Sequence, residues 1–322
     1  MKTKNDSGIN DRLLTLLQQG VSISPKPFSG IAEQLELDEA EVIQRAVYLK
    51  REGLIRRFGG VWNSARLGFK SCLFAVDIPL AKVDNVAAII NEDPGVTHSY
   101  LRDGRPNLWF TLTAHESEFG FKVEAIRNFA RPYQLLEMPA VKHFKVQVIF
   151  DKSGRTDRQR SCPFPTSSVK LTSFERELVK YFQGDVSLAG NCFKAAACKF
   201  CCSEENILSG LKKLYDKGAL KRIAAIIRHT RFGFKGNSMC VWSMEPDKLA
   251  ESGNMLASRN EVSHCCERKS CAEFPFNLYA MVHASNEAAV KDKVAVLSSI
   301  LSTPATMLTS VRELKKTSPV YF

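Results

Sequence analysis

A histidine followed four residues later by an arginine occurs twice, as His98 with Arg102 and as His264 with Arg268. On a β-strand, residues at this spacing point to the same face, so the imidazole and the guanidinium can address one ligand. Histidine titrates near neutral pH, whereas arginine keeps a fixed positive charge. The pairs therefore predict proton transfer to an anionic substrate. The alternative is a strand histidine beside a surface arginine.

A second candidate group consists of Arg228, His229 and Arg231. The corresponding segment earlier in the chain has Asn63 and Ser64 where this one has Arg228 and His229. The two segments are therefore not chemically equivalent, and the difference favours an asymmetric site whose acid chemistry lies mainly in the second half. A solvated loop is the alternative.

These residues belong to a module that the chain contains twice. Six residues recur at a constant offset of 165 positions: Gly53, Arg57, Arg66, Gly68, Phe69 and Lys70 return as Gly218, Arg222, Arg231, Gly233, Phe234 and Lys235. Each copy opens with apolar residues at helical spacing, and Asp38 and Ser203 are expected to cap the third helices. Strand and helix patterns then follow in the order βαββαβ, which is typical of a ferredoxin-like domain.

We therefore predict an α+β fold, a tandem repeat of a winged helix-turn-helix and a ferredoxin-like domain. The last strands are expected at 141–150 and 305–312. A stretch rich in Ser, Arg, Pro and Thr separates the copies and is typical of a solvated linker. The expected domains are a helix-turn-helix at 1–62, a ferredoxin-like domain at 63–150, the linker at 151–170, a helix-turn-helix at 171–227 and a ferredoxin-like domain at 228–322.

Composition limits the class of protein. The 322 residues are 44% hydrophobic, enough for packed cores, and no apolar run is long enough to span a membrane. The polar N-terminus lacks the apolar region of a signal peptide, so we expect a cytoplasmic protein with reduced thiols. A net charge of +11 requires an anionic partner, such as nucleic acid, an acidic membrane or a small polyanion.

Several of the ten cysteines are clustered, and they raise the question of a metal site. Cys198 and Cys201 form a C-x-x-C pair near Cys192 and Cys202, but no second ligand pair follows. We expect no bound metal there. Cys265, Cys266 and Cys271 are interpreted as buried neutral thiols beside His264.

A helix-turn-helix joined to a ferredoxin-like domain resembles the leucine-responsive class of transcription regulators. In such proteins the first residues of the third helix enter the major groove. Here these residues are mostly acidic: Asp38, Glu39 and Glu41 in the first copy, with Ser203, Glu204 and Glu205 in the second. Carboxylates oppose binding to phosphates, so we expect the helix-turn-helix to be structural and DNA binding to be unlikely.

Longer motifs resemble siroheme decarboxylase. Gly95 to Arg102, with Asn107 to Leu112, is similar to one subunit of that enzyme. Arg222 to His229 and Val262 to Cys265, with Phe274 to His283, are similar to its partner subunit. The chain thus resembles a natural fusion of the two subunits. This implies loss of CO2 from the C12 and C18 acetate side chains of siroheme, giving 12,18-didecarboxysiroheme for heme or heme d1 synthesis.

The resemblance also suggests roles for individual residues. His229 and His264 would donate protons, while Arg57, Arg222, Arg228 and Arg231 would hold carboxylates. His98 and Arg102 would contribute from the other half, Trp109 and Tyr279 would flank the ring, and Asn277 would contact the substrate. Cys266 and Phe276 stand where the family usually has tyrosine, so two phenol hydroxyls are missing.

We expect the cleft between the ferredoxin-like domains, which form a pseudo-dimer within the chain, and a homodimer of chains is a further option. No cofactor or protein-bound metal is required, because siroheme brings its own iron; heme is a further candidate ligand. The first alternative function is a heme- or tetrapyrrole-sensing regulator of the leucine-responsive type, and the second is an inactive tetrapyrrole carrier. The downstream pathway and the order of the two decarboxylations stay open.

Overall fold

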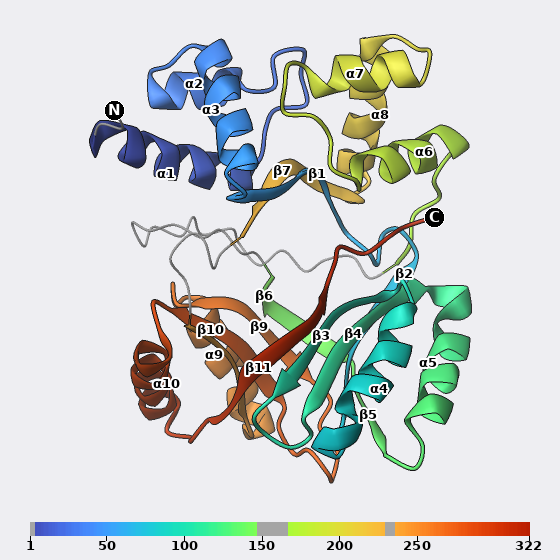
Figure 1. Cartoon of the computed structure of the whole chain (residues 1–322), viewed down its shortest axis with the longest axis vertical. Coiled ribbons are helices and arrows are strands. Elements are labelled where there is room, and N and C mark those ends of the chain that lie inside the picture. Colours follow the sequence, from blue (N-terminus) through green and yellow to red (C-terminus); the bar gives the residue numbers. More distant parts are fainter. Residues whose placement is uncertain (1–3, 147–166, 229–235) are drawn as a thin grey trace.

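Helices form where apolar residues recur every three to four positions, and those near the start of each copy gather in one layer (Figure 1). The computed structural model describes residues 4–146, 167–228 and 236–322. The helices of this layer are α1 (Lys4–Gln19), α2 (Ser29–Leu35), α3 (Glu39–Arg51), α6 (Ser173–Phe182), α7 (Cys192–Lys199) and α8 (Glu204–Asp216). Both copies therefore supply a three-helix unit.

The ends of the third helices follow their local sequence. Asp38 caps α3 by accepting a hydrogen bond from the Glu41 backbone N–H at 2.8 Å, and Ser203 caps α8 in the same way. Gly53 and Gly218 stand just after these helices with φ of 74° and 68°, values that favour glycine. The predicted caps are confirmed.

The two helical units are interlaced. Strands β1 (Ile55–Trp62) and β7 (Leu220–Ile227) form an antiparallel ribbon between the copies. The Val21 backbone N–H of copy one donates to Ile223 O, and Val186 N–H of copy two donates to Phe58 O, each at 2.8 Å. One hydrophobic core extends through both units, including Leu13, Phe58, Phe182 and Ile223. Neither unit closes its core alone.

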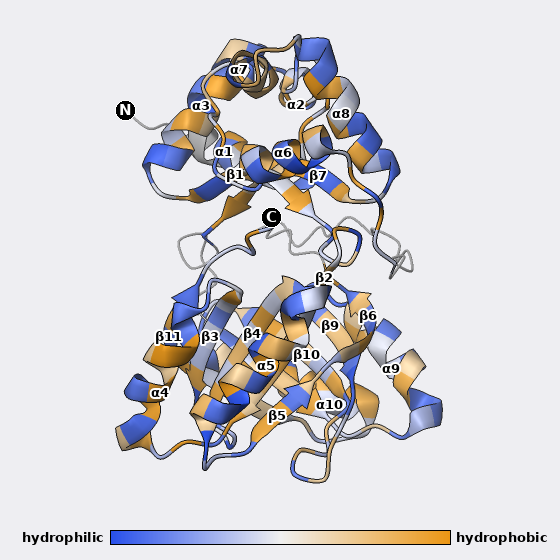
Figure 2. Cartoon of the chain, turned by 90° about the vertical axis from the view of Figure 1, so that its right-hand side faces the viewer, coloured by the Kyte–Doolittle hydropathy of each residue, from blue (hydrophilic) through white to orange (hydrophobic). Residues whose placement is uncertain are grey.

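The second layer is a continuous antiparallel sheet with helices on its outer faces (Figure 2). Its strands lie in the order β5, β2, β4, β3, β11, β8, β10, β9, β6. Copy one supplies β2 (Phe69–Val76), β3 (Val96–Arg102), β4 (Leu108–His115), β5 (Leu135–Met138) and β6 (Ala140–Lys145). Copy two supplies β8 (Gly236–Trp242), β9 (Val262–Arg268), β10 (Leu278–Ala284) and β11 (Thr306–Lys316). The predicted fold class is confirmed.

The last strand of each copy pairs with both copies. In copy two, β11 pairs first with its own β8 and then with β3 of copy one. In copy one, β5 pairs with its own β2, and β6 pairs with β9 of copy two. The first of these strands was expected at 141–150, but it begins at Leu135 and divides at Pro139, which has no N–H to donate to a ladder. Residues 147–150 lie outside the described residues.

The helices α4 (Leu80–Glu92), α5 (Glu116–Ala130), α9 (Pro246–Ala257) and α10 (Glu287–Leu301) cover the outside of the sheet. The helix-side cores of the two halves are separate clusters. A third cluster, which includes Trp109, Phe274 and Tyr279, fills the space between the inner faces of the sheet. The helices in the described part of the chain lack the length and apolar character needed to cross a membrane.

The C-terminal segment links the two layers. After β11 the chain rises to the helical layer (Figure 1), where Tyr321 is buried in its core. The Tyr321 hydroxyl lies 2.7 Å from Ser64 Oγ, and its backbone N–H donates to the Gln183 side chain. These contacts hold the C-terminal segment against the helical layer.

Close packing inside the helical layer gives a test of stability. A Cβ at Gly59 would lie 2.6 Å from the backbone oxygens of Phe182 and Gly184, so Gly59→Ala should lower the free energy of unfolding by about 1–3 kcal/mol. Gly30→Ala is the matched control, because nothing lies within 4 Å of its added Cβ. The measurement is urea unfolding followed by circular dichroism. Equal unfolding midpoints for the two variants would contradict the close approach.

Candidate active site

A bulge before each histidine turns its side chain inward, because the pairing of β3 is irregular between Val96 and His98 and that of β9 between Val262 and His264. Val96 of β3 and Val262 of β9 lie in the helix-side cores. His98 and His264 lie opposite Thr111 and Met281 on the neighbouring strands. Their rings make equivalent contacts, with His98 Nδ1 3.0 Å from Thr97 Oγ1 and His264 Nδ1 3.2 Å from Ser263 Oγ.

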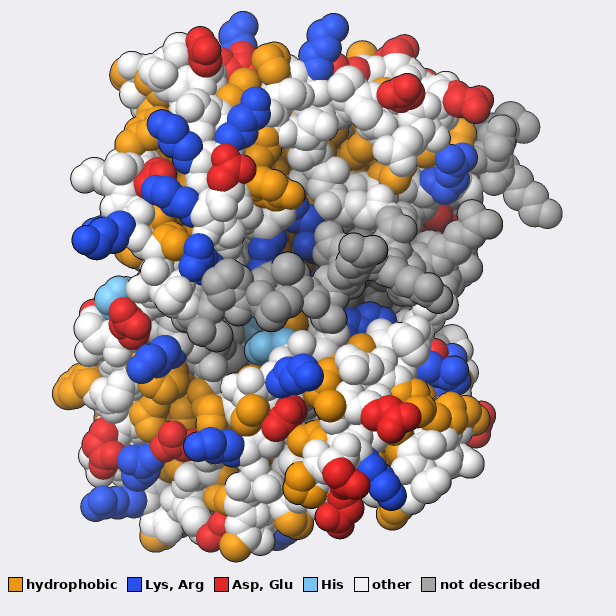
Figure 3. Space-filling view, turned by 180° about the vertical axis from the view of Figure 1, so that it is seen from behind, with side chains coloured by type: hydrophobic (Ala, Val, Ile, Leu, Met, Phe, Trp, Pro, Cys, Tyr) orange, Lys and Arg blue, Asp and Glu red, His pale blue; other side chains and the backbone are white. Residues whose placement is uncertain are grey.

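These histidines face the region between the layers, and Figure 3 shows histidine and basic side chains at this level of the molecule. We call this region the waist site and define it by five residues whose charges influence one another: His98, His143 and His264 from the sheet, with Arg56 and Lys221 from the ribbon above. The charge of Arg56 contributes to the lowered pKa of His98, and that of Lys221 contributes to the lowered pKa of His143. Both of these histidines contribute to the lowered pKa of His264. Both copies therefore contribute to one site.

The waist site holds its histidines neutral. Desolvation first, and then the charges of Lys316 and Arg56, lower the pKa of His98 to about 4. Desolvation, followed by His98, His143 and nearby cations, lowers the pKa of His264 to about 4. The His264 side chain nevertheless keeps accessible surface. Glu313 is the carboxylate that acts on His98 and Arg56, so the cations and histidines of the site outnumber its negative charge.

Arg57 and Arg222 do not face the waist site, which corrects the sequence-based assignment of both as substrate clamps. Arg57 Nη1 donates to Gln183 O at 2.7 Å and Gly184 O at 3.1 Å. Arg222 Nε donates to Gln18 O at 2.9 Å. Both guanidiniums therefore hold the ends of first helices in the helical layer. The residues one position earlier, Arg56 and Lys221, stand at irregularities of the ribbon pairing, and their charges act on His98 and His143 of the sheet.

Arg102 is also occupied within the protein. Its Nη1 donates to Leu308 O in β11 at 2.7 Å, and the residue is buried. Desolvation lowers its pKa to about 10. Arg102 therefore fastens β11 to β3 and is not a free anchor for a carboxylate, contrary to the expectation from its spacing to His98.

Three further predicted contacts are structural. Trp109 is 1% exposed, with Nε1 donating to Pro106 O, and Tyr279 is 3% exposed, so neither can flank a ligand in the waist site. Asn277 bonds the backbone of Met244 through both ends of its amide, at 2.7 and 2.8 Å. These residues were expected at the substrate because their motifs are unusual, but their side chains stabilise turns and core.

The group Arg228, His229 and Arg231 is described only in part. Arg228 is exposed at the end of β7, its backbone N–H donates to Leu54 O, and its charge helps to lower the pKa of Arg56 after desolvation. It therefore lies beside the waist site. His229 and Arg231 lie outside the described residues.

Sequence reasoning missed three members of the waist site: Arg56, Lys221 and His143. Arg56 and Lys221 are related by the repeat offset, so a conserved positive charge was a usable signal. His143 has no histidine counterpart in the second copy, and its strand pairs with the opposite copy. Nothing in the local sequence pointed to it.

The cysteines of the helical layer do not converge. Cys192 is buried, whereas Cys198 and Cys201 are exposed. Within the described ranges, no group of three or more His, Cys, Asp or Glu side chains is placed to hold a metal ion.

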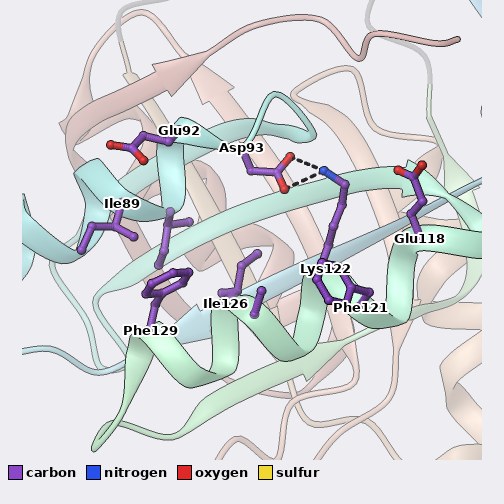
Figure 4. A pocket seen from close by; sticks show the side chains of 10 residues that line it. Ile89, Glu92, Asp93, Glu118, Phe121, Lys122, Ile126 and Phe129 are labelled. Carbon is purple, nitrogen blue, oxygen red and sulfur yellow. Dashed lines mark hydrogen bonds and ion pairs between the residues drawn. The ribbon is translucent and has the colours of Figure 1, made fainter.

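A pocket between α4 and α5 is chemically different from the waist site (Figure 4). Apolar side chains such as Ile89, Phe121 and Phe129 line it. Lys122 is paired with Asp93 at 2.8 Å, and Glu92 and Glu118 add further negative charge. This pocket would repel a polyanion, so the waist site is the candidate active site.

The lowered histidine pKa values predict a pH dependence of stability. Between about pH 6.5 and pH 4 the unfolded chain binds protons that the folded protein excludes from His98 and His264, so stability present above about pH 6.5 is lost as pH falls. His98→Gln and His264→Gln should each reduce this loss. Urea midpoints at about pH 7 and pH 5 measure it. An unchanged pH dependence in both variants would contradict the lowered values.

Comparisons with known proteins agree with this geometry. Residues 66–145 and 231–315 match the AsnC-like ligand binding domain, and residues 10–56 match the siroheme decarboxylase NirDL-like HTH domain. The chain is 31% identical to a siroheme decarboxylase of Hydrogenobacter thermophilus over 97% of its length and 94% of that protein. It is 41% identical to a siroheme decarboxylase alpha subunit of Desulfovibrio desulfuricans, over 43% of this chain and 80% of that subunit.

A solved structure extends the likeness to three dimensions. The siroheme decarboxylase NirDL in co-complex with an iron-uroporphyrin III analogue superimposes with a TM-score of 0.71 at 27% identity, covering 97% of this chain and 94% of that one. A relative that is similar across nearly its whole length, together with matching domain models in both halves, shows the family predicted from the sequence motifs. This chain belongs to the siroheme decarboxylase family.

Proposed function

We propose that this protein binds siroheme at the waist site and removes CO2 from its C12 and C18 acetate side chains, giving 12,18-didecarboxysiroheme for heme or heme d1 synthesis. The observation that carries the proposal is the set of histidines and cations that both copies bring together at the waist site. Siroheme bears eight carboxylates, so it suits a site where cations and histidines outnumber the carboxylate of Glu313. The NirDL structure with an iron-uroporphyrin III analogue supports the same class of ligand.

The chemistry needs little from the protein beyond charge and a proton. When the bond between the acetate methylene and its carboxylate breaks, the electron pair passes to the methylene and the conjugated ring beside it. A proton then binds the methylene carbon to form a methyl group, and CO2 leaves. Each decarboxylation therefore consumes one proton, which the protein must deliver and then recover from water.

His264 and His98 are suited to this delivery once the substrate is bound. In the empty site their low pKa keeps them neutral. Carboxylates placed beside them favour the charged imidazolium and raise the pKa toward the working pH. The substrate thus charges its own proton donors. His229 stays a third candidate, because Arg228 before it lies beside Arg56.

The anchors are assigned from the contacts and charges of the ribbon residues. Arg56, Lys221 and Arg228 face or border the waist site, whereas Arg57 and Arg222 are occupied by backbone oxygens in the helical layer. Lys221, whose pKa is lowered to about 8 by desolvation and then by Arg222, would regain full charge beside a carboxylate. Arg231 stays a proposed anchor on the basis of the repeat alone.

Anaerobic incubation with siroheme tests the function. The wild-type product should have lost the mass of two CO2 molecules, and His264→Gln should lower kcat by about 10²- to 10⁴-fold, the usual contribution of a placed general acid. His115→Gln is the control, because His115 lies at the start of α5 with its ring against Ser117. Tight siroheme binding without loss of mass would contradict the enzyme and favour a carrier. Tetrapyrrole-dependent release of promoter DNA would favour a regulator.

Adjacent ribbon residues test the anchors. Arg56→Gln should weaken siroheme binding about tenfold or more, as expected for loss of a charged hydrogen bond, with little change in thermal stability. Arg57→Gln should instead lower the melting temperature, because it removes contacts to Gln183, Gly184 and Gly60. Absorbance titration gives Kd, and thermal unfolding gives the melting temperature. Weaker siroheme binding in Arg57→Gln, with a lower melting temperature in Arg56→Gln, would show instead that Arg57 is the residue that faces the waist site.

A further inference from the structure

The pseudo-twofold repeat divides the waist site into two half-sites that can be compared residue by residue. Each half-site combines a third strand of one copy, β3 or β9, with the last strand of the other, β11 or β6. Two arginines at equivalent positions make equivalent hydrogen bonds. Arg102 donates to Leu308 O of β11 at 2.7 Å, and Arg268 donates to Met138 O of β5 at 2.6 Å. From these points the two pairs of strands run in matching register.

The half-sites differ at one cross-strand pair. In the first, Tyr100 of β3 stands opposite Glu313 of β11, and the Tyr100 hydroxyl lies 3.4 Å from the carboxylate. In the second, the same register places Cys266 of β9 opposite His143 of β6. The second half-site therefore has the thiol of Cys266 in place of the phenol of Tyr100, and the imidazole of His143 in place of the carboxylate of Glu313. Burial raises the pKa of the Cys266 thiol, as it raises that of the Tyr100 hydroxyl.

His143 is placed to take over the missing group. Its side chain is exposed, and Phe144 beside it turns to the helix-side core, so His143 points to the opposite face. The charged groups that act on it are Arg268 of β9 and Lys221 of β7, and it acts in turn on His264. Its ring makes no hydrogen bond to the described residues. A proton donor without an internal partner therefore faces the waist site.

We infer that His143 is a catalytic residue of the second half-site, where it protonates the methylene carbon left by one acetate, while the half-site of Tyr100 handles the other acetate. This inference rests on the proposed siroheme decarboxylation. As the carbon–carbon bond to the carboxylate breaks and CO2 leaves, its electron pair forms a bond to the proton of the His143 imidazolium. The ring is left neutral and takes up a proton from water. Each half-site thus serves one of the two side chains.

The test follows the two decarboxylations separately by anaerobic mass spectrometry. His143→Gln should accumulate a product that has lost one CO2, with loss of the other slowed about 100-fold or more. Tyr100→Phe should accumulate the complementary monodecarboxylated isomer, separable by chromatography. Added imidazole should restore the second loss in His143→Gly, which a structural role would not allow. Lys142→Gln is the matched control, because Lys142 turns to the other face, with Nζ 5.0 Å from the Phe144 ring centroid.

Each contrary outcome has a distinct meaning. Wild-type rates for both losses in His143→Gln would overturn the inference, and so would equal slowing of both losses. A changed absorption spectrum of bound siroheme with equal slowing would mark His143 as a ligand of the substrate iron instead. If the wild-type protein itself releases no CO2, the proposed function fails before the half-sites are compared.

Discussion

The pairing of each copy's last strand with the third strand of the other copy is the constraint on which the molecule depends. Through β11 with β3, and β6 with β9, the two halves share one sheet, and its inner faces enclose a common core around Trp109 and Tyr279. The ribbon of β1 and β7 repeats this exchange in the helical layer. In both layers, strands of one copy pair with strands of the other. The two halves therefore cannot rotate independently, and residues distant in sequence are held close together at the waist site.

This rigidity allows the waist site to keep an unfavourable charge distribution. Desolvation first, and then nearby positive charges such as Arg56 for His98 and Arg268 for His264, lower the pKa values of the two histidines. Such clusters are tolerated where the surrounding packing fixes the backbone. A polyanionic ligand would reverse the balance, because each carboxylate stabilises the cations and the imidazolium together. Substrate binding and acid strength are therefore coupled through one electrostatic field.

The acidic residues of the helix-turn-helix units serve the fold. Glu39 accepts a hydrogen bond from the Phe28 backbone N–H, and its repeat equivalent Glu204 accepts one from Asn191. Asp38 caps α3. Residues that would contact DNA in a regulator thus stabilise the turn between the helices. This supports a structural role for the helical layer, which borders the waist site.

The sequence by itself determined the modules and the chemistry. Helical and strand periodicities, the caps at Asp38 and Ser203 and the repeated motifs depend on neighbouring residues, so the fold class, the family and the two strand histidines could be read from them. Only the tertiary structure decided which basic residues face the waist. An irregularity in the pairing of β1 lies at Arg56, whose charge acts on His98 of the sheet, whereas Arg57 is bonded to the helical layer. His143 joins the site through pairing with the other copy, a long-range contact that no local pattern encodes.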